Sequence, residues 1–148
     1  MSLSGGCRCG ACRYDLDGNA LPAVYACHCR DCQTMSGAAF TLQAPIPPAR
    51  LSLTGAVAEW TNVSRNGYET IQRACARCMT RLYSVNAGRP GIALLRAGTL
   101  DRSDEVAPIL HLWTDRKQPW ITLAAEMEAY PRAAPEGRME TLFAGNFS

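Results

Sequence analysis

The sequence predicts a mainly β fold in a single domain. The chain has 148 residues, and its hydrophobic fraction of 47 % is enough to bury a core. Short segments with the composition of β-strands alternate with glycine, proline and asparagine turns, a pattern typical of all-β proteins. No linker or change of composition divides the chain, so we expect one domain over residues 1–148.

In the first half of the chain we expect strands at 12–16, 24–26, 40–43, 51–53 and 57–60. The turn Asp17-Gly18-Asn19 ends the first of these segments. Pro45, Pro47 and Pro48 are expected to stop the strand at 40–43, because proline has no backbone N–H for a sheet ladder.

In the second half we expect strands at 69–73, 82–85, 92–96 and 109–113, with a loop at 86–91. The dipeptide Asn66-Gly67 predicts a hairpin between the strands on either side of it. Residues 124–129 predict a short helical turn, and the segment after Pro135 contains no motif that indicates a function.

The charge and hydropathy of the chain exclude several classes of protein. The net charge is +2, the pI is about 8.2, and the arginines are scattered, so we expect no nucleic-acid partner. No apolar run approaches the length that spans a membrane. The N-terminus lacks the basic and apolar regions of a signal peptide, which predicts a cytoplasmic protein with reduced thiols. Lys117 is the single lysine, and that alone gives it no catalytic role.

Eight cysteines fall into three clusters, CRCGAC, CHCRDC and CARC. Bridging cysteines only two apart would make a strained ring, and disulfide frameworks belong to exported chains. The motifs C-x-C and C-x-x-C instead turn the backbone so that two sulfurs converge on one ion. Iron–sulfur clusters use the same ligands, but the spacing does not match ferredoxin patterns. The clusters therefore predict zinc.

Spacing alone leaves two ways to divide the cysteines. Four thiolates close a structural zinc site, whereas three leave a position open for a ligand. In one division the closed site takes Cys7, Cys9, Cys75 and Cys78, and the open site takes Cys27, Cys29 and Cys32. In the other, the Cys27-x-Cys29 pair joins Cys75 and Cys78, and the open site takes Cys7, Cys9 and Cys12.

Several stretches together resemble the glutathione-dependent formaldehyde-activating enzyme family. They are GCRCGACRY, ACHCRDCQTMSGAAF, a Ser-Arg-Asn-Gly turn, RACARCMTRLYS, HLWTDRKQPW and EAYPRAAP, which cover residues 5 to about 135. The resemblance implies an Mss4-like fold of antiparallel sheets, zinc knuckles and short helical turns. It also implies two zinc ions: a structural one at Cys7, Cys9, Cys75 and Cys78, and a catalytic one at Cys27, Cys29 and Cys32.

Two further positions are interpreted through the same resemblance. Cys12 matches a position that is often apolar, so we expect a small core side chain. Met79 stands where the family usually has a glycine. Since glycine adopts positive φ at little cost, the knuckle is expected to turn differently or carry strain at Met79.

An open site of three thiolates on Zn²⁺ has a net charge of −1 and suits a fourth, soft ligand. Metal ligation deprotonates a substrate thiol at neutral pH, and the thiolate is the nucleophile. The resemblance implies addition of glutathione to formaldehyde, a carbon–sulfur lyase class of reaction. The alternatives are a glutathione carrier and a non-catalytic zinc module that binds protein partners.

The remaining candidates lie around CHCRDC or in apolar runs. His28 lies between two ligands and is expected to point away from the ion or to support it by a hydrogen bond; His111 is expected to be structural. Arg30 and Gln33 are candidates to meet ligand carboxylates, and Ser36 to line the site. The aromatic residues are expected in the core: Phe40, Trp60, Trp113 and Trp120.

Overall fold

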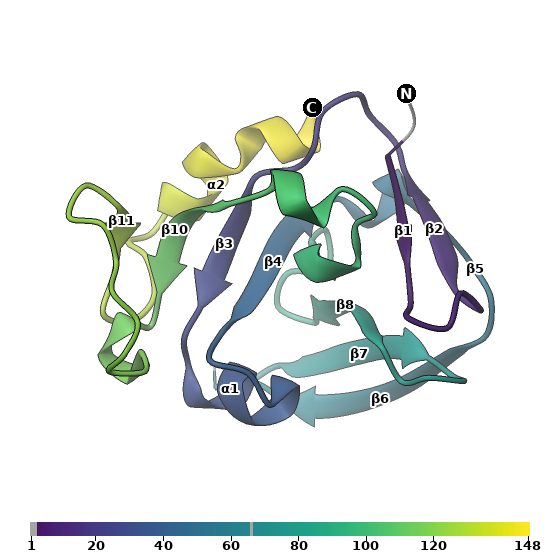
Figure 1. Cartoon of the computed structure of the whole chain (residues 1–148), viewed down its shortest axis with the longest axis horizontal. Helices are drawn as coiled ribbons and strands as arrows, with labels where there is room; N and C mark the ends of the chain where they lie inside the picture. Colours follow the sequence, from purple (N-terminus) through teal and green to yellow (C-terminus); the bar gives the residue numbers. More distant parts are fainter. Residues whose placement is uncertain (1–2, 66) are drawn as a thin grey trace.

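The strands of the computed structural model form two sheets within the described residues, 3–65 and 67–148 (Figure 1). The smaller sheet has the order β1-β2-β5, and the larger has the order β11-β10-β3-β4-β9-β8-β7-β6. The strands are β1 (Leu3–Gly6), β2 (Arg13–Leu16), β3 (Val24–Cys27), β4 (Thr41–Ile46), β5 (Leu51–Thr54), β6 (Val57–Val63), β7 (Glu69–Cys75), β8 (Arg81–Asn86), β9 (Ala93–Arg96), β10 (Pro108–Leu112) and β11 (Glu128–Ala129).

Helices are short and lie at the ends of the larger sheet. α1 (Arg30–Ser36) follows the end of β3, and α2 (Arg138–Leu142) lies near the start of β3 (Figure 1). Single 3₁₀ turns complete the chain: η1 (Pro48–Arg50), η2 (Ala97–Thr99), η3 (Ser103–Glu105), η4 (Thr114–Arg116) and η5 (Ala144–Phe147). None of the described helices is both long enough and apolar enough to cross a membrane.

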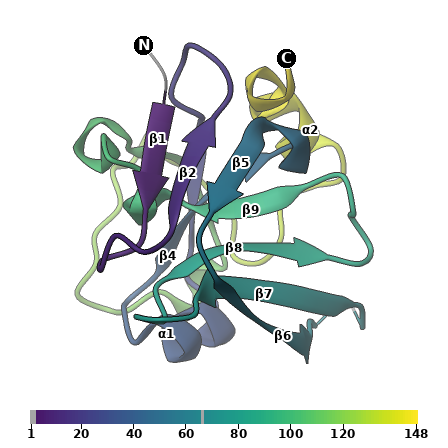
Figure 2. The ribbon, with the colours of Figure 1, turned by 90° about the vertical axis from the view of Figure 1, so that its right-hand side faces the viewer.

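The main core lies between the two sheets, whose strands cross in Figure 2. In β2 the sequence RYDL alternates, so that Tyr14 and Leu16 are buried while Arg13 and Asp15 face solvent. They pack with Leu3 of β1 and with Ala44 and Leu95 of the larger sheet. The period of two along a strand therefore fixes which face of each sheet forms the core.

The opposite face of the larger sheet is polar although much of it is buried. Thr70 and Gln72 of β7 are 8 % and 3 % exposed, Ser84 of β8 is 3 % exposed, and Gln43 of β4 is 4 % exposed. Cross-strand pairing places Gln72 beside Ser84 and Thr70 beside Asn86. Because buried polar side chains are costly unless partnered, such a face is typical of a binding site rather than of a core.

The predicted strands are present with shifted ends, and β4 corrects one expectation. β4 runs through Pro45 to Ile46 instead of stopping before Pro45. Pairing with β3 covers only Thr41 to Gln43, whereas pairing with β9 continues to Ile46. The carbonyl of Pro45 accepts a bond from the Asn146 side chain. The N–H and C=O of a strand residue point to the same side. The position of the missing N–H of Pro45 therefore faces the side where β3 has already ended, and it interrupts no ladder.

Other expectations are refined near the C-terminus and at the hairpin. Residues 124–129 form a turn that ends in β11, not a helical turn, because β11 pairs in parallel with β10. β10 also runs parallel to β3, within sheets that are otherwise paired antiparallel. β6 and β7 form the hairpin predicted from Asn66-Gly67, although Asn66 itself lies outside the described residues.

Candidate metal centres and the adjoining pocket

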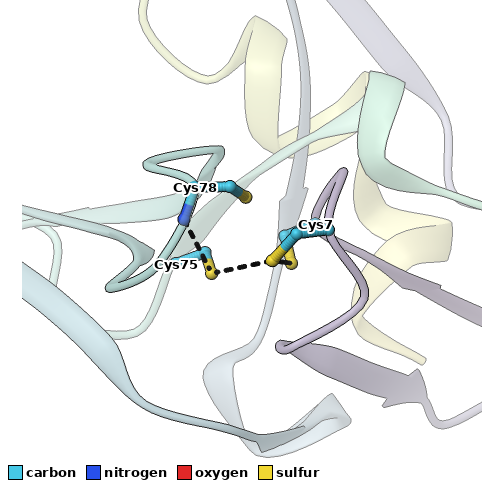
Figure 3. Close-up of side chains that lie close together, drawn as sticks. Cys7, Cys75 and Cys78 are labelled. Atoms are coloured by element: carbon cyan, nitrogen blue, oxygen red, sulfur yellow. Dashed lines mark hydrogen bonds between the residues drawn. The ribbon is translucent and has the colours of Figure 1, made fainter.

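Four cysteines from two distant turns meet at one point between the sheets. Cys7 and Cys9 lie in the turn after β1, Cys75 ends β7, and Cys78 lies in the turn between β7 and β8. Figure 3 shows Cys7 facing Cys75 and Cys78. The four sulfurs lie within 4.8 Å of one another, with Cys7–Cys9 at 3.6 Å and Cys9–Cys75 at 3.9 Å. Sulfurs held tetrahedrally at roughly 2.3 Å from one ion lie about 3.8 Å apart. The cluster therefore fits a four-coordinate metal ion.

Backbone N–H groups converge on these sulfurs, as expected for a thiolate knuckle. The N–H of Cys12 donates to Sγ of Cys7 over 3.2 Å, and the N–H of Arg77 donates to Sγ of Cys75 over 3.3 Å. Hydrogen bonds of this kind stabilise the charged form of an acceptor. Met79 closes the knuckle at a φ of 62°, and its N–H bonds to the carbonyl of Cys75. The expected strain is thus located in a left-handed residue that is not glycine.

Cys12 belongs to the packing around this cluster and not to its ligands. Its side chain is fully buried against Leu82, and its thiol donates to the carbonyl of Ala56 over 3.2 Å. Burial raises the pKa of the Cys12 thiol to about 11. Cys12 therefore stays a neutral core side chain, and the alternative open site that includes it is not formed.

The second cluster consists of Cys27, Cys29 and Cys32, whose sulfurs also lie within 4.8 Å of one another. Cys27 ends β3, and Cys29 is the N-cap of α1, whose sulfur accepts a bond from the N–H of Cys32 over 3.3 Å. The cap turns the chain so that a strand residue and a helix residue present their thiols to the same point. Among the described residues no fourth cysteine joins this cluster. Three soft ligands of this kind fit a metal ion that keeps one coordination position open.

The three thiols influence one another's ionisation. Contacts with Cys27 and Cys29 lower the pKa of Cys32, whereas contacts with Cys29 and Cys32 raise the pKa of Cys27. Hydrogen bonds donated by the neighbouring thiols stabilise the first thiolate in the cluster. A second thiolate so close to it is destabilised by charge repulsion. A bound cation removes that repulsion, since ligation by a metal deprotonates thiols outright.

A pocket of about 290 Å³ opens beside these three cysteines. Its floor is the polar face of the larger sheet, including Gln43 and Gln72. Gln43 donates to Sγ of Cys32 over 3.6 Å and accepts a 2.7 Å bond from the hydroxyl of Tyr25. The three-cysteine cluster thus faces a space lined by hydrogen-bonding groups. None of the cysteines of the four-cysteine cluster lines this pocket.

Arg96 lines this pocket, and Arg81 lies beside the pocket residue Gln72; both guanidinium groups have unused donors. Nη1 of Arg96 and both Nε and Nη1 of Arg81 are buried and have no hydrogen-bond partner among the described residues. Nη2 of Arg81 donates to Oε1 of Gln72. Burial lowers the pKa of Arg96, while the charge of Cys32 acts in the opposite direction. Guanidinium groups carry a positive charge at neutral pH, so Arg96 places positive charge in the pocket lining next to the three cysteines, and Arg81 adds to it from behind Gln72.

The sequence profile of the glutathione-dependent formaldehyde-activating enzyme family matches residues 2–116, and the seven clustered cysteines all lie within that match. The chain belongs to this family. No curated protein matches it. A crystal structure of a Rhodobacter sphaeroides protein, 18 % identical, superposes with a TM-score of 0.54 over 71 % of this chain and 97 % of its own. This likeness supports the fold alone, and the mainly β, Mss4-like fold predicted from the sequence is confirmed.

His28, which was expected to point away from the ion or to support it by a hydrogen bond, has His111 as its partner. His28 is fully buried, and its Nε2 lies 2.8 Å from Nδ1 of His111. Its ring also lies 5.1 Å from that of Phe40. Burial, with lesser effects of His111 and Lys117, lowers the pKa of His28 to about 4. The two rings form a neutral buried pair behind the three-cysteine turn, so His28 is directed away from the cluster.

Other candidates around the CHCRDC motif have structural partners. Gln33 is buried, and its amide donates to the carbonyls of His28 and Arg116 over 2.8 Å each, so it fixes the loop that follows β10. The hydroxyl of Ser36 donates to the carbonyl of Cys32 within α1 and does not line the pocket. Arg30 is exposed and lines a separate recess beside Cys29.

The tryptophans do not form the core that was expected of them. Trp60 and Trp120 are 37 % and 73 % exposed. Trp113 is half-buried, lines the pocket beside the three cysteines and has a φ of 58°. A bulky side chain in the left-handed region is uncommon and costly, and such residues cluster at functional sites. The apolar context of Trp113 in the sequence gave no sign of this conformation.

Arginines surround the outer side of Cys29. Arg30, Arg65, Arg116 and Arg132 line one recess with Cys29, and Asp115 is the acidic residue of that lining. Asp115 lies 3.6 Å from Arg132, and Asp31 lies 3.5 Å from Arg65. The arginines outnumber these acidic partners, so this recess favours anionic ligands.

Proposed function

We propose that the protein binds a thiol such as glutathione at a zinc ion held by Cys27, Cys29 and Cys32, and adds it to a small aldehyde or releases it from the adduct. This is a carbon–sulfur lyase type of reaction. The observation that carries the proposal is the position of the three-cysteine cluster at the wall of a polar pocket. Cys7, Cys9, Cys75 and Cys78 would hold a second, structural zinc.

Bound zinc would supply a site at which a substrate thiol is held as its thiolate at neutral pH. The residues of the chain determine which thiol fits. Arg96 lines the pocket and has an unused donor, and the arginines beside Cys29 line the neighbouring recess. Glutathione carries two carboxylates, and arginine pairs with carboxylates through charge-assisted hydrogen bonds. This charge complementarity supports glutathione over a neutral thiol.

The amides on the pocket floor complete the polar surroundings of the reacting atoms. Addition of a thiolate to an aldehyde places a developing negative charge on the carbonyl oxygen. Gln43 is fixed by Tyr25 and Thr41, so its amide is oriented before any ligand arrives. Donors that are held in place stabilise developing charge at no cost of reorganisation. The amide of Gln43 already donates to Sγ of Cys32 and Oγ1 of Thr41, so we assign Gln43 to the Cys32 thiolate. The amide of Gln72, held by Asn62 and Arg81 in the same pocket lining, is the one that we assign to the oxygen of the adduct.

The proposal is tested by zinc content and glutathione calorimetry on the wild type and on Cys29→Ser. We expect two zinc ions in the wild type and about one in the variant, with loss of glutathione binding. Cys12→Ser serves as the matched control, because it changes a buried thiol that ligates neither site. Two zinc ions with no glutathione binding in the wild type would refute the assignment and favour a binding module without this chemistry.

A further inference from the structure

A second pocket, of about 400 Å³, lies between the larger sheet and the C-terminal segment. Its floor includes Tyr25, Pro45 and Leu94, and Met139 and Phe143 of the C-terminal segment form its wall. Tyr25 and Pro45 are buried, and the Tyr25 and Phe143 rings meet edge to face at 5.7 Å. The charged residues of its lining, Arg89 and Glu140, are exposed. The interior of this pocket is therefore apolar.

The apolar pocket and the metal-site pocket lie on one face of the larger sheet. Pro45 follows Gln43 by two residues on β4, and Leu94 precedes Arg96 by two residues on β9. Side chains two residues apart on a strand point to the same face, in adjacent rows. Leu94 and Asn86 line both pockets. A ligand lying across these two residues would thus contact both.

We propose that the apolar pocket binds an aliphatic or aromatic substituent on the aldehyde, so that the substrate aldehyde is larger than formaldehyde. This inference rests on the proposed function. In the addition, the thiol sulfur forms a bond to the carbonyl carbon, the π electrons of the carbonyl move to oxygen, and the proton of the thiol ends on that oxygen. The adduct is a hemithioacetal whose polar half lies over Arg96 and whose apolar half lies under α2.

The size and composition of the pocket support this substrate class. Formaldehyde carries no substituent and would leave an apolar space of about 400 Å³ without a ligand. A cavity of about 150 Å³ lined by apolar side chains already holds benzene. The wall made by Met139 and Phe143 comes from residues beyond the family match, which ends at residue 116. The floor of the pocket thus lies within the part of the chain that the family profile matches, and its wall lies outside that part.

The test compares S-methylglutathione with S-hexylglutathione by calorimetry on the zinc-loaded protein. Both compounds carry the same peptide and a thioether, so the difference between them reports the alkyl chain alone. Each methylene that leaves water tightens binding about fourfold, so we expect the hexyl compound to bind at least about tenfold more tightly. Ala144→Trp and Ile92→Trp fill the pocket from two sides. Each should abolish the difference and leave the affinity for S-methylglutathione unchanged.

Ala125→Trp is the matched control, because Ala125 is exposed and lines none of the described pockets. Equal affinities of the two compounds for the wild type would overturn the inference. If no glutathione compound binds, the proposed function fails, and 1-hexanol then tests the pocket by itself. In NMR spectra, 1-hexanol should shift the ring resonances of Tyr25 and Phe143 in the wild type and not in Ala144→Trp, which would support an apolar ligand in the pocket. Unshifted resonances in the wild type would overturn the inference.

Discussion

Met79 occupies a backbone conformation that glycine adopts more easily. Its φ is 62° and its side chain is 54 % exposed, so it gains little from packing. The left-handed region costs a side chain about 1–2 kcal/mol, more than the roughly 0.5–1 kcal/mol that glycine costs through entropy. We expect Met79→Gly to raise the free energy of unfolding by about 0.5–1 kcal/mol in urea titrations. Arg77→Gly is the control in the same knuckle, where φ is not positive, and it should lower stability.

Arg96 is the residue on which charge recognition in the proposed site depends most. A hydrogen bond to a charged group contributes about 1.5–3 kcal/mol. We therefore expect Arg96→Gln to weaken glutathione binding about ten- to hundredfold in calorimetry, with the zinc content unchanged. Arg102→Gln, which removes an exposed partner of Glu105 far from the pocket, should bind glutathione like the wild type. An unchanged affinity of Arg96→Gln for glutathione would show that Arg96 does not bind a carboxylate of this ligand.

At the scale of elements, the C-terminal segment is attached to the sheet through Asn146. Its amide accepts from the N–H of Ala23 over 2.8 Å and donates to the carbonyls of Ala23 and Pro45 over 3.0 and 2.8 Å. Asn146→Asp places a carboxylate against two carbonyls without changing the shape of the side chain. A buried group without its partner costs about 1–3 kcal/mol. We expect Asn146→Asp to lower the free energy of unfolding in urea by at least this amount. Asn19→Asp, in an exposed turn, should leave the free energy of unfolding unchanged.

The sequence predicts the elements whose signals are local and misses those that depend on distant partners. Cysteine spacing and family resemblance together give the division of the seven clustered cysteines into a group of four and a group of three, since each turn is encoded within a few residues. The course of β4 through Pro45 depends on where β3 ends and on Asn146, which lies 101 residues further along the chain. Thr70, Gln72 and Ser84 have ordinary strand propensities, so only their burial identifies them as a pocket floor.

At the scale of the whole molecule, the four-cysteine cluster joins the turn after β1 to the turn between β7 and β8. It therefore connects the two sheets, whereas Cys27, Cys29 and Cys32 lie within one short segment. Since a structural metal contributes its binding energy to folding, Cys78→Ser should lower the melting temperature far more than Cys29→Ser. A single unfolding transition is expected for the one predicted domain. Equal losses in the two variants would contradict the structural role of the first site.

The central claim is that the three-cysteine metal accepts a thiol from solution. Its most direct test is the visible and near-ultraviolet spectrum of the cobalt-substituted protein during titration with glutathione. Cobalt reports each new thiolate ligand as added thiolate-to-metal absorption, and it occupies tetrahedral sites built for zinc. We expect this absorption to increase with glutathione, not to increase with S-methylglutathione, and to be insensitive to glutathione in Cys29→Ser. A wild-type spectrum that glutathione leaves unchanged would contradict the claim.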